Sequence, residues 1–501
     1  MGKIFAEYSY KKGAAVSVFC TAAWKIISFA NSVLLAFYFG ASSYTDIYFY
    51  LIMLAGMGMT FAAGINTNAV IPHAMHLGGK DKNGEFGFLN RFIIFYLGLG
   101  LLLAVLAAAA PGFWLGLISR FNDFTPGAQA LFGLAALYFA SLIITNFLIN
   151  ILERHKIFGI AWLSPLNALA PFLLLVFFHK TLGIAAMVCG FIIANVLQSA
   201  ACLIVMFGKL GWRPELDCPG LNKKFWHNFV AAAGTEGLNF FTSALPVFIM
   251  SGFAAAAVTA LNYARQIIDS PTEIITNRIT LVSRVQFNEK ENKRDYKGLA
   301  QSFYNNLFIL LILMTPIAVF CCFYSYEIVR TLFERGRFSY ETANSTAAFI
   351  SLFTPTLVLL LPFYLYRNLA ASARKLKEFF IIPLLSALFF TAAVFYFMNV
   401  YGGYGYPAAI IASNIFSLLI VWPFVKKHFT FISHARTLFE MGKMIVLALI
   451  PALLVSAVTS NLFQNYIVNL IANGIFYVVF FAVEVMLFYG GKLKQFLKSG
   501  F

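Results

Sequence analysis

Fourteen apolar stretches, each about 20 residues or longer, alternate with short polar segments along the chain. The hydrocarbon core of a bilayer is about 30 Å thick, so a helix needs about 20 residues to cross it. The apolar runs are continuous rather than alternating with a period of two, and lipid offers no partner to backbone polar groups, so the pattern predicts transmembrane helices. The expected spans are 14–38, 47–71, 90–110, 131–152, 158–178, 182–207, 226–248, 254–276, 304–325, 344–366, 378–399, 404–425, 442–461 and 467–490.

The basic residues between these spans fall almost entirely on every second loop. Lys and Arg in short loops mark the cytoplasmic side of a membrane protein. With both termini cytoplasmic, 29 of the 36 Lys and Arg lie in cytoplasmic segments or at the cytoplasmic ends of spans, and two lie deeper within spans. A missed or an added span would invert every later loop, so this alternation supports the count of fourteen. The five basic residues left outside are Arg120, Lys180, Arg330, Arg335 and Arg337.

Composition excludes several other classes of protein. The chain has 501 residues, of which 60% are hydrophobic and 11% are charged, so it has too little polar surface for a soluble domain. No loop is long enough to hold an appended catalytic domain. The net charge of +16 is spread over the cytoplasmic segments, where attraction to anionic lipid explains it more simply than nucleic-acid binding.

The usual signatures of an enzyme or a metal site are missing from the sequence. The six cysteines form no CxxC pair and are interpreted as reduced, small apolar residues. The seven histidines lie in loops or near span ends, with no metal-ligand spacing inside the membrane. There is no GxSxG, P-loop or HExxH motif. The sequence therefore indicates neither an enzyme nor a resident metal or cofactor.

Ionisable residues inside spans are costly in lipid and thus point to a substrate path, an ion site or an internal pair. The most polar span contains Arg265, Asp269 and Glu273, which recur every four residues along one helix face. This face is either the wall of a water-filled cavity, with Pro271 allowing a bend, or the site of an Arg265–Asp269 pair that only packs against neighbours. Lys25 in the first span is interpreted as a cation facing a cavity.

Glu236 lies in the seventh span within the sequence GTEGLNFF, where small residues allow close helix approach. Two interpretations are open: a proton or sodium site, and a protonated acid hydrogen-bonded between helices. The uncharged Asn31, Asn239 and Asn262 are candidates for hydrogen bonds to a polar substrate. Asp46 opens the second span and is interpreted as a charge favoured by the helix dipole.

Four segments resemble the MviN/MurJ lipid-linked glycan flippases of the multidrug/oligosaccharidyl-lipid/polysaccharide exporter superfamily. Residues 333–349, FERGRFSYETANSTAAF, are similar to that family's LFxxGxF(T/S)xxD/E motif, and residues 39–50, FGASSYTDIYFY, resemble its FGAGxxxDAFFVA. Residues 261–271, LNYARQIIDSP, look like YYADRLxExP, and residues 61–72, FAAGINTNAVIP, look like FAEGAFSxAFVP. The order of these motifs agrees with the family over most of the chain.

The resemblance implies two six-helix lobes around a V-shaped cavity, with helices 13 and 14 added as a lateral groove for a lipid tail. The expected domains are residues 1–224 for the first lobe, 225–428 for the second and 429–501 for the added helices and the tail. A faint repeat of helices 1–6 in helices 7–12 is also expected, with Gly40 and Gly252 in two similarly short outer turns that serve as hinge candidates together with Pro271.

In that family, arginines of helices 1, 2 and 8 are thought to hold the substrate diphosphate, and the present chain departs from this pattern. Lys25 and Asn31 stand in the two helix-1 positions, and Met57, Gly58 or Met59 in the helix-2 position. In helix 8 the position falls at Gln266, one residue after Arg265. Lys25 and Arg265 are thus the expected diphosphate ligands, with a point charge in place of one bidentate fork. Glu236 matches a sodium ligand of some relatives, but helices 11 and 12 carry no carboxylate.

The expected function is a flippase that moves an undecaprenyl-diphosphate-linked sugar, the peptidoglycan precursor lipid II or a similar molecule, from the cytoplasmic to the outer face of a bacterial inner membrane by alternating access. Membrane potential, H⁺ or Na⁺ are the candidate driving forces, and proteins of cell-wall or polysaccharide synthesis are candidate partners. The alternatives are a flippase for an exopolysaccharide, O-antigen or capsule repeat unit, a small-molecule exporter, a membrane-embedded transferase, and an inert scaffold.

Overall fold

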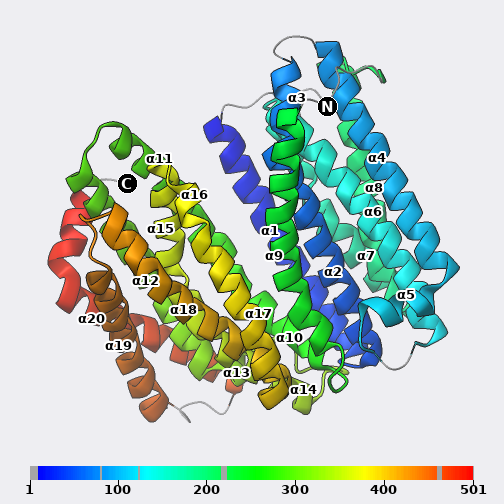
Figure 1. Cartoon of the computed structure of the whole chain (residues 1–501). Helices are drawn as coiled ribbons and strands as arrows, with labels where there is room; N and C mark the ends of the chain where they lie inside the picture. Colours follow the sequence, from blue (N-terminus) through cyan, green and yellow to red (C-terminus); the bar gives the residue numbers. More distant parts are fainter. Residues whose placement is uncertain (1–9, 79–81, 122–123, 216–222, 460–464, 500–501) are drawn as a thin grey trace. The chain divides into compact units, whose positions relative to one another are not determined.

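The computed structural model describes residues 10–78, 82–121, 124–215, 223–459 and 465–499, and all regular secondary structure in them is helical (Figure 1). The chain forms two compact units. Unit 1 comprises residues 1–259 and the short segment 336–338, and unit 2 comprises residues 260–335 and 339–501. The boundary at 259/260 separates two groups of residues that each pack mainly among themselves. The lobe boundary expected at 224/225 instead separates the two copies of the six-helix repeat, and it stays a prediction.

Each of the fourteen expected spans coincides with one helix or with a run of consecutive helices. Those that lie in unit 1 are α1 (Tyr10–Phe39), α2–η1–α3 (Ser43–Ile65, Asn66–Val70, Ile71–Gly78), α4 (Lys82–Ala109), α6 (Pro126–Arg154), η2–α7 (Phe158–Leu163, Leu166–Leu182), α8–η3 (Ala185–Val205, Met206–Leu210) and α9 (Lys223–Met250). The eighth span is α10 (Ala257–Pro271) with η4 (Thr272–Thr276) and α11 (Asn277–Asn292), and it begins in unit 1 and continues in unit 2.

The remaining spans lie in unit 2. They are α12 (Tyr296–Phe323), α14–α15 (Tyr340–Leu359, Leu361–Ser372), α16–α17 (Leu376–Phe379, Ile381–Tyr401), α18 (Gly405–His428) after the short η5 (Gly402–Tyr404), α19 (His434–Thr459) and α20 (Tyr466–Ser499). By length and apolarity alone, eleven stretches of the described chain qualify as membrane spans, one of which, Leu376–His428, contains two helices. The other two spans are α9 and the α10–α11 run, which carry most of the polar residues singled out above.

Two short helices were not expected from the sequence. Helix α5 (Pro111–Ile118) follows α4, and helix α13 (Ser325–Leu332) follows α12, each after a single connecting residue. Both have eight residues, and the helices before them, α4 and α12, both have 28. Eight residues rise only about 12 Å, too short to cross a bilayer, so neither helix changes the number of spans.

The backbone of helices 7–12 repeats further details of helices 1–6. Gly183 before the sixth span has φ +59° and ψ −140°, and Gly402 before the twelfth has φ +59° and ψ −141°. Lys156 between spans 4 and 5 has φ +63°, and Arg374 between spans 10 and 11 has φ +58°. Non-glycine residues rarely adopt a positive φ, so matched positions of this kind are a strong sign of a shared local structure.

The core of unit 1 contains an aromatic cluster at the end of the bundle where α9 begins. Phe225 of α9 contacts Phe88 and Phe92 of α4, and Phe92 in turn contacts Phe147 of α6. The buried residues around them come from α2, α3, α4, α6 and α8. Spans 2 to 4 and the start of span 7 therefore share one packed core.

Two spans contain a π turn next to a proline. Segment η1 is followed closely by Pro72, and η4 directly follows Pro271. A proline ring clashes with the carbonyl one turn earlier, so the wider turn η1 accommodates Pro72 without ending the helix. Segment η4 comes after Pro271 and is not explained in this way. Pro271 thus lies at a real irregularity of the eighth span, as its expected role as a hinge requires.

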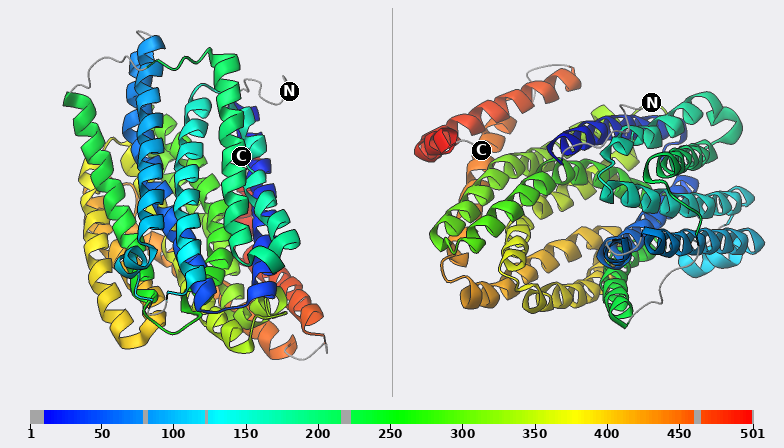
Figure 2. Two further views of the ribbon diagram at one scale, coloured as in Figure 1. Left: turned by 90° about the vertical axis from the view of Figure 1, so that its right-hand side faces the viewer. Right: turned by 90° about the horizontal axis from the view of Figure 1, so that it is seen from above.

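Helices α19 and α20 pack against each other and against α12 on one side of unit 2 (Figure 2). A cavity of about 540 Å³ lies between α12 and α20, lined by apolar residues of both helices and by Tyr477. Five of the six cysteines are free thiols, and Cys218 lies outside the described residues. The described chain also contains no cluster of His, Cys, Asp or Glu that would hold a metal ion.

Candidate functional site

Lys25 lies in α1, with its ammonium group 5.1 Å from the ring centroid of Trp24. Its side chain is half-buried. A cation over an aromatic face retains part of its charge stabilisation outside bulk water. The first span thus carries a positive charge that the Trp24 ring stabilises and that remains partly accessible.

Asn31, two turns further along α1, has a mainly structural environment. Its side chain is 3% exposed, and its amide group donates a hydrogen bond to the carbonyl of Ala168 at 2.8 Å. This bond ties α1 to α7. The substrate contact expected for Asn31 stays a prediction, and in this structure the amide donor is already engaged.

In unit 2, Arg265 and Asp269 form an ion pair on α10. The guanidinium Nε lies 3.2 Å from Oδ2 of Asp269, and their side chains are 34% and 46% exposed. Tyr406 of α18 is close enough to interact electrostatically with Arg265. Arg265 and Asp269 thus form the expected pair at i,i+4, and both side chains stay half-accessible. This geometry fits a cavity wall as well as a pair that only packs against neighbours.

The other polar residues of α10 continue the same pattern. Asn262 accepts a hydrogen bond from Gln266 at 3.0 Å, so the residue at the family's arginine position bonds within its own helix. Glu273 is exposed and lies inside the π turn η4. Asn262 and Glu273 are thus on the eighth span with Arg265, and their expected roles stay predictions.

Glu236 of α9 packs directly against the bare backbone of α2. A Cβ placed on Gly64 would overlap the Glu236 carboxyl group, so only glycine leaves room for it. Asn239 donates a hydrogen bond to Oε2 of Glu236 at 3.2 Å. The close helix approach expected around this carboxylate is therefore present, and its partner is the second span.

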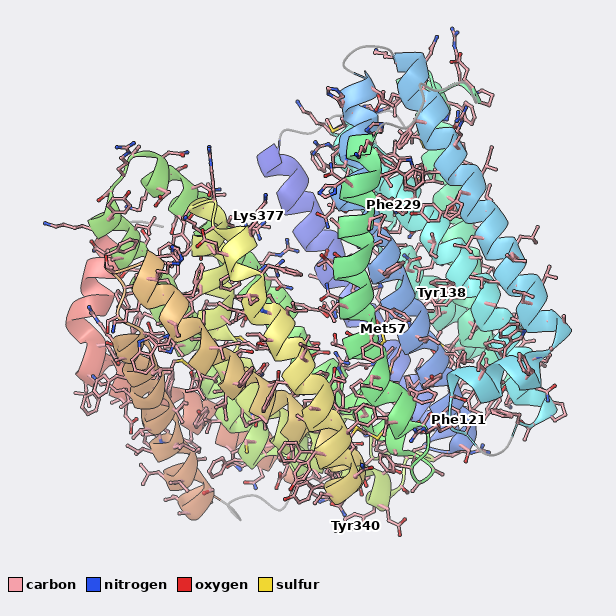
Figure 3. The ribbon with its side chains drawn as sticks, in the orientation of Figure 1. Met57, Phe121, Tyr138, Phe229, Tyr340 and Lys377 are labelled. Carbon is pink, nitrogen blue, oxygen red and sulfur yellow. The ribbon has the colours of Figure 1, made fainter. Side chains whose placement is uncertain are left out.

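The second-span position of the family's missing arginine faces two different environments. Met57 is half-buried (Figure 3). At Gly58, a Cβ would lie 2.6 Å from the ring of Phe139, so a side chain there requires this ring to move. Met59 is half-buried, as Met57 is. Whichever of these three residues stands at the family's arginine position, the second span contributes no charge there.

The turn between α1 and α2 receives a segment from far along the chain. The N–H of Arg337 donates a hydrogen bond to the carbonyl of Phe37 at 3.0 Å, and residues 336–338 belong to unit 1. Gly40 has φ +61°, and a Cβ there would overlap the carbonyl of Arg337. Two segments that resemble family motifs, 39–50 and 333–349, therefore meet in one contact.

Asp46 has a role that the sequence did not reveal. It is 2% exposed, and its Oδ1 accepts hydrogen bonds from the N–H of Thr259 at 2.8 Å and from its hydroxyl at 2.5 Å. Thr259 lies in the first turn of α10, so one carboxylate stabilises the N-termini of two helices. The sequence placed Asp46 at the start of the second span, but nothing in it identified Thr259 as the partner.

Gly252, the second hinge candidate, lies in a turn that Arg120 covers. A Cβ on Gly252 would lie 3.1 Å from Cβ of Arg120, and the N–H of Arg120 donates to the hydroxyl of Ser251 at 2.8 Å. The turns at 40–42, 119–121 and 251–256, together with residues 336–338, form what we call the turn end of unit 1. Gly40 and Gly252 thus lie at the same end of one unit.

A family model described as "Lipid II flippase MurJ" matches residues 35–477 of the chain. The chain belongs to the lipid II flippase MurJ family. The resemblance carried by the four motifs is thereby confirmed. As a MurJ family member, the protein is a multi-pass inner-membrane transporter of the flippase class and not an enzyme. The match begins at residue 35, so Arg265 lies inside it and Lys25 lies before it.

Two curated MurJ relatives are similar over most of their length. The probable lipid II flippase MurJ of Borreliella burgdorferi is 22% identical over 438 residues, which cover 84% of each chain. The probable lipid II flippase MurJ of Aquifex aeolicus is 24% identical over 406 residues, or 78% of each chain.

Solved structures show the same fold. One titled "Lipid II flippase MurJ, inward closed conformation" has a TM-score of 0.80 at 18% identity and covers 96% of this chain and all of its own. A multidrug resistance MATE transporter of the MOP superfamily has a TM-score of 0.60 at 12% identity and covers 84% of this chain. The fold is thus the MurJ fold, related to that of MATE transporters.

Proposed function

We propose that this MurJ family member carries a polyprenyl-diphosphate-linked sugar, lipid II or a close relative, from the cytoplasmic to the outer face of the inner membrane by alternating access. The family match over residues 35–477 carries this proposal. Such a substrate has a polar head that must cross about 30 Å of hydrocarbon while its tail remains in lipid. A membrane protein with polar residues inside its spans provides a path for that head.

Lys25 and Arg265 are the residues we assign to the diphosphate. Each is half-accessible inside a span, Lys25 in unit 1 and Arg265 in unit 2. A guanidinium offers a planar fork to phosphate, and an ammonium offers a point charge. Asn239 and Asn262 are exposed or half-exposed amides that would bond the sugar, while the amide of Asn31 is held by Ala168.

One segment of the tail, which as a whole is longer than any cavity described here, is assigned to the cavity of about 540 Å³ between α12 and α20. Its lining is apolar apart from the hydroxyl of Tyr477, which donates to the carbonyl of Ala448 and is therefore satisfied. Hydrocarbon can occupy this space without desolvating a polar group.

The orientation and driving force follow from charge. The loop pattern of Lys and Arg supports cytoplasmic termini, which would put the turn end of unit 1 on the outer side. Outward movement of a negative head is favoured by an inside-negative potential, by about 2.3 kcal/mol per charge per 100 mV. Membrane potential is therefore the driving force we propose, and Glu236 is the candidate for a coupled proton.

A second candidate substrate is an exopolysaccharide or capsule repeat unit on the same kind of carrier. The observation that favours it is the loss of the family's arginine positions at Met57 and Gln266. A different glycan would need fewer fixed phosphate contacts if its sugar supplied more of the binding free energy.

Complementation tests the assignment of the substrate. Cells depleted of their own lipid II flippase would receive the wild type or the Lys25→Ala, Arg265→Ala double variant, with Lys180→Ala as a control that also removes a cation. We expect growth with the wild type and with Lys180→Ala, and loss of growth with the double variant at equal protein level. Rescue by the double variant would refute the cation assignment. Failure of a well-expressed wild type would refute lipid II as the substrate.

A further inference from the structure

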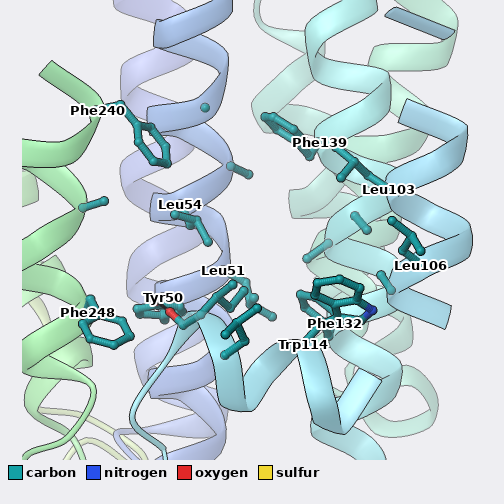
Figure 4. A pocket seen from close by; sticks show the side chains of 18 of the residues that line it. Tyr50, Leu51, Leu54, Leu103, Leu106, Trp114, Phe132, Phe139, Phe240 and Phe248 are labelled. Atoms are coloured by element: carbon teal, nitrogen blue, oxygen red, sulfur yellow. Dashed lines mark hydrogen bonds between the residues drawn. The ribbon is translucent and has the colours of Figure 1, made fainter. Parts of the chain in front are cut away.

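A second and larger cavity lies inside unit 1, between α2, α4, α5, α6 and α9 (Figure 4). Its volume is about 700 Å³. Leucine, alanine and aromatic side chains line it, among them Leu54, Leu103, Phe139 and Phe240, and none of the lining residues is charged. Such a lining fits hydrocarbon.

The cavity is about as long as the chain region of one leaflet. Helix α2 lines it from Tyr50 to Gly58, and α9 lines it from Phe240 to Phe248. Eight residues of helix rise about 12 Å. One leaflet contributes about 15 Å to the hydrocarbon core. The cavity therefore accommodates most of one fatty acyl chain, whereas a polyprenyl chain is several times longer.

The cavity opens at the surface of the protein. Its floor is buried, with Tyr50 3% and Leu51 4% exposed. Its rim is open, with Leu117 60% and Phe241 50% exposed. Both rim residues are apolar and therefore compatible with contact to hydrocarbon, so an acyl chain can enter the cavity past them.

A cation and a tryptophan lie at the turn end of this cavity. The guanidinium of Arg120 lies 5.1 Å from the ring centroid of Phe248, which is one of the lining residues. Arg120 is exposed, and its backbone is fixed by the bond to Ser251. Trp114 lines the cavity nearby on α5, and tryptophan is enriched at the level of lipid headgroups.

We propose that this cavity binds one acyl chain of an anionic phospholipid, with the lipid phosphate held by Arg120. The proposal rests on the outer placement of the turn end made above. A chain that leaves the bilayer for the cavity gains no hydrophobic free energy, because both surroundings are apolar. The gain comes from contacts that fill an otherwise empty space and from the pairing of guanidinium with phosphate. The charge of Arg120 thus favours an anionic headgroup, and the length of the cavity favours a fatty acyl chain.

Lipid retention by the purified full-length protein tests this site. The protein would be reconstituted with phosphatidylcholine and phosphatidylglycerol in equal amounts, and the lipid that stays bound would be counted by native mass spectrometry. Phosphatidylglycerol with brominated chains would also be used to quench Trp114, with Trp114→Phe giving the background. The variants are Arg120→Gln for the head, Ala55→Phe to fill the cavity, and Lys180→Gln as the matched loss of a surface cation.

We expect one retained phosphatidylglycerol in the wild type and in Lys180→Gln. Arg120→Gln should weaken its binding about fivefold, as expected for one cation near a headgroup. Ala55→Phe should abolish the quenching of Trp114. Equal losses in Arg120→Gln and Lys180→Gln, or equal retention of the two phospholipids, would overturn the proposal. Displacement by polyprenyl phosphate at equal concentration would assign the cavity to the carrier instead. Because no transport is measured, these outcomes are independent of the substrate assignment.

Discussion

The N–H of Arg337 donates to the carbonyl of Phe37 at 3.0 Å, which binds residues from two distant parts of the chain at the turn end of unit 1. Gly336 has φ +64° and packs so closely on Phe37 that a Cβ would overlap it. Gly40 makes the reciprocal approach to Arg337. The glycines of both motif segments are therefore required by one contact.

We expect Gly40→Ala to lower the thermal stability of the purified protein. The substitution adds both a strained positive φ and an overlap with the Arg337 carbonyl. Gly211→Ala is the control, since Gly211 has φ +64° and ψ 34°, in the left-handed helical region, with open space around it. Strain alone costs about 1–2 kcal/mol. A melting temperature that falls equally in both variants would show that the contact with Arg337 contributes nothing.

Asp46 and Thr259 should be energetically coupled. Asp46→Asn removes the charge that stabilises two helix N-termini, and Thr259→Val removes one of its two donors. A hydrogen bond to a buried charge contributes about 1.5–3 kcal/mol. Unfolding of the two single variants and the double variant in detergent gives the coupling free energy. Strictly additive effects would mean that the two side chains do not interact.

Gly64→Ala should displace the carboxyl group of Glu236. We expect reduced growth in the complementation assay for Gly64→Ala. Gly56→Ala should grow normally, because Gly56 lies on the same helix with open space around it. Glu236→Ala removes the overlapping group, so the Gly64→Ala, Glu236→Ala double variant should be as stable as Glu236→Ala alone. If Gly64→Ala instead lowers stability equally with and without Glu236, the close approach is not what requires glycine.

Variants of the Arg265–Asp269 pair should affect stability and transport differently. Asp269→Leu leaves a cation without its partner in the membrane and should cost about 1 kcal/mol, because the pair is half-exposed. Replacing both residues by leucine should restore stability, as apolar replacements of ion pairs often do. We nevertheless expect the double variant to fail in complementation, because Arg265 is a proposed diphosphate ligand. A stable double variant that supports growth would show that the pair contributes to packing and not to substrate binding.

Hydrophobic length, together with the alternation of basic loops, was enough to predict the fourteen spans, because lipid allows few alternatives to a helix of about 20 residues. The length criterion missed α5, which is apolar but too short to cross, and α13, which is equally short and carries Glu327 and Arg330. Boundaries were less accurate where helices extend beyond the membrane, as α4 does by beginning at Lys82 instead of the expected 90. A span count follows from length, whereas helix ends depend on caps and turns.

Pairs of residues far apart in sequence could not be predicted. The i,i+4 spacing of Arg265 and Asp269 anticipated their contact, since one helix determines it. The partner of Asp46 lies on another helix, and the acceptor of the Asn31 amide on a third. Periodicity identifies the face on which a residue lies but not the helix that meets that face.

The matched lengths of α4 and α12, of α5 and α13, and the matched turns at Gly183 and Gly402 have an evolutionary consequence. Six spans are an even number, so both copies of the repeat enter and leave the membrane on the same side. A gene encoding one copy could therefore have served as a homodimer before duplication and fusion, without any change of orientation. Helices α19 and α20 have no counterpart in the first half of the chain and belong to neither copy. Their acquisition ended the symmetry of that ancestor, because only the second half of the chain is followed by two further helices.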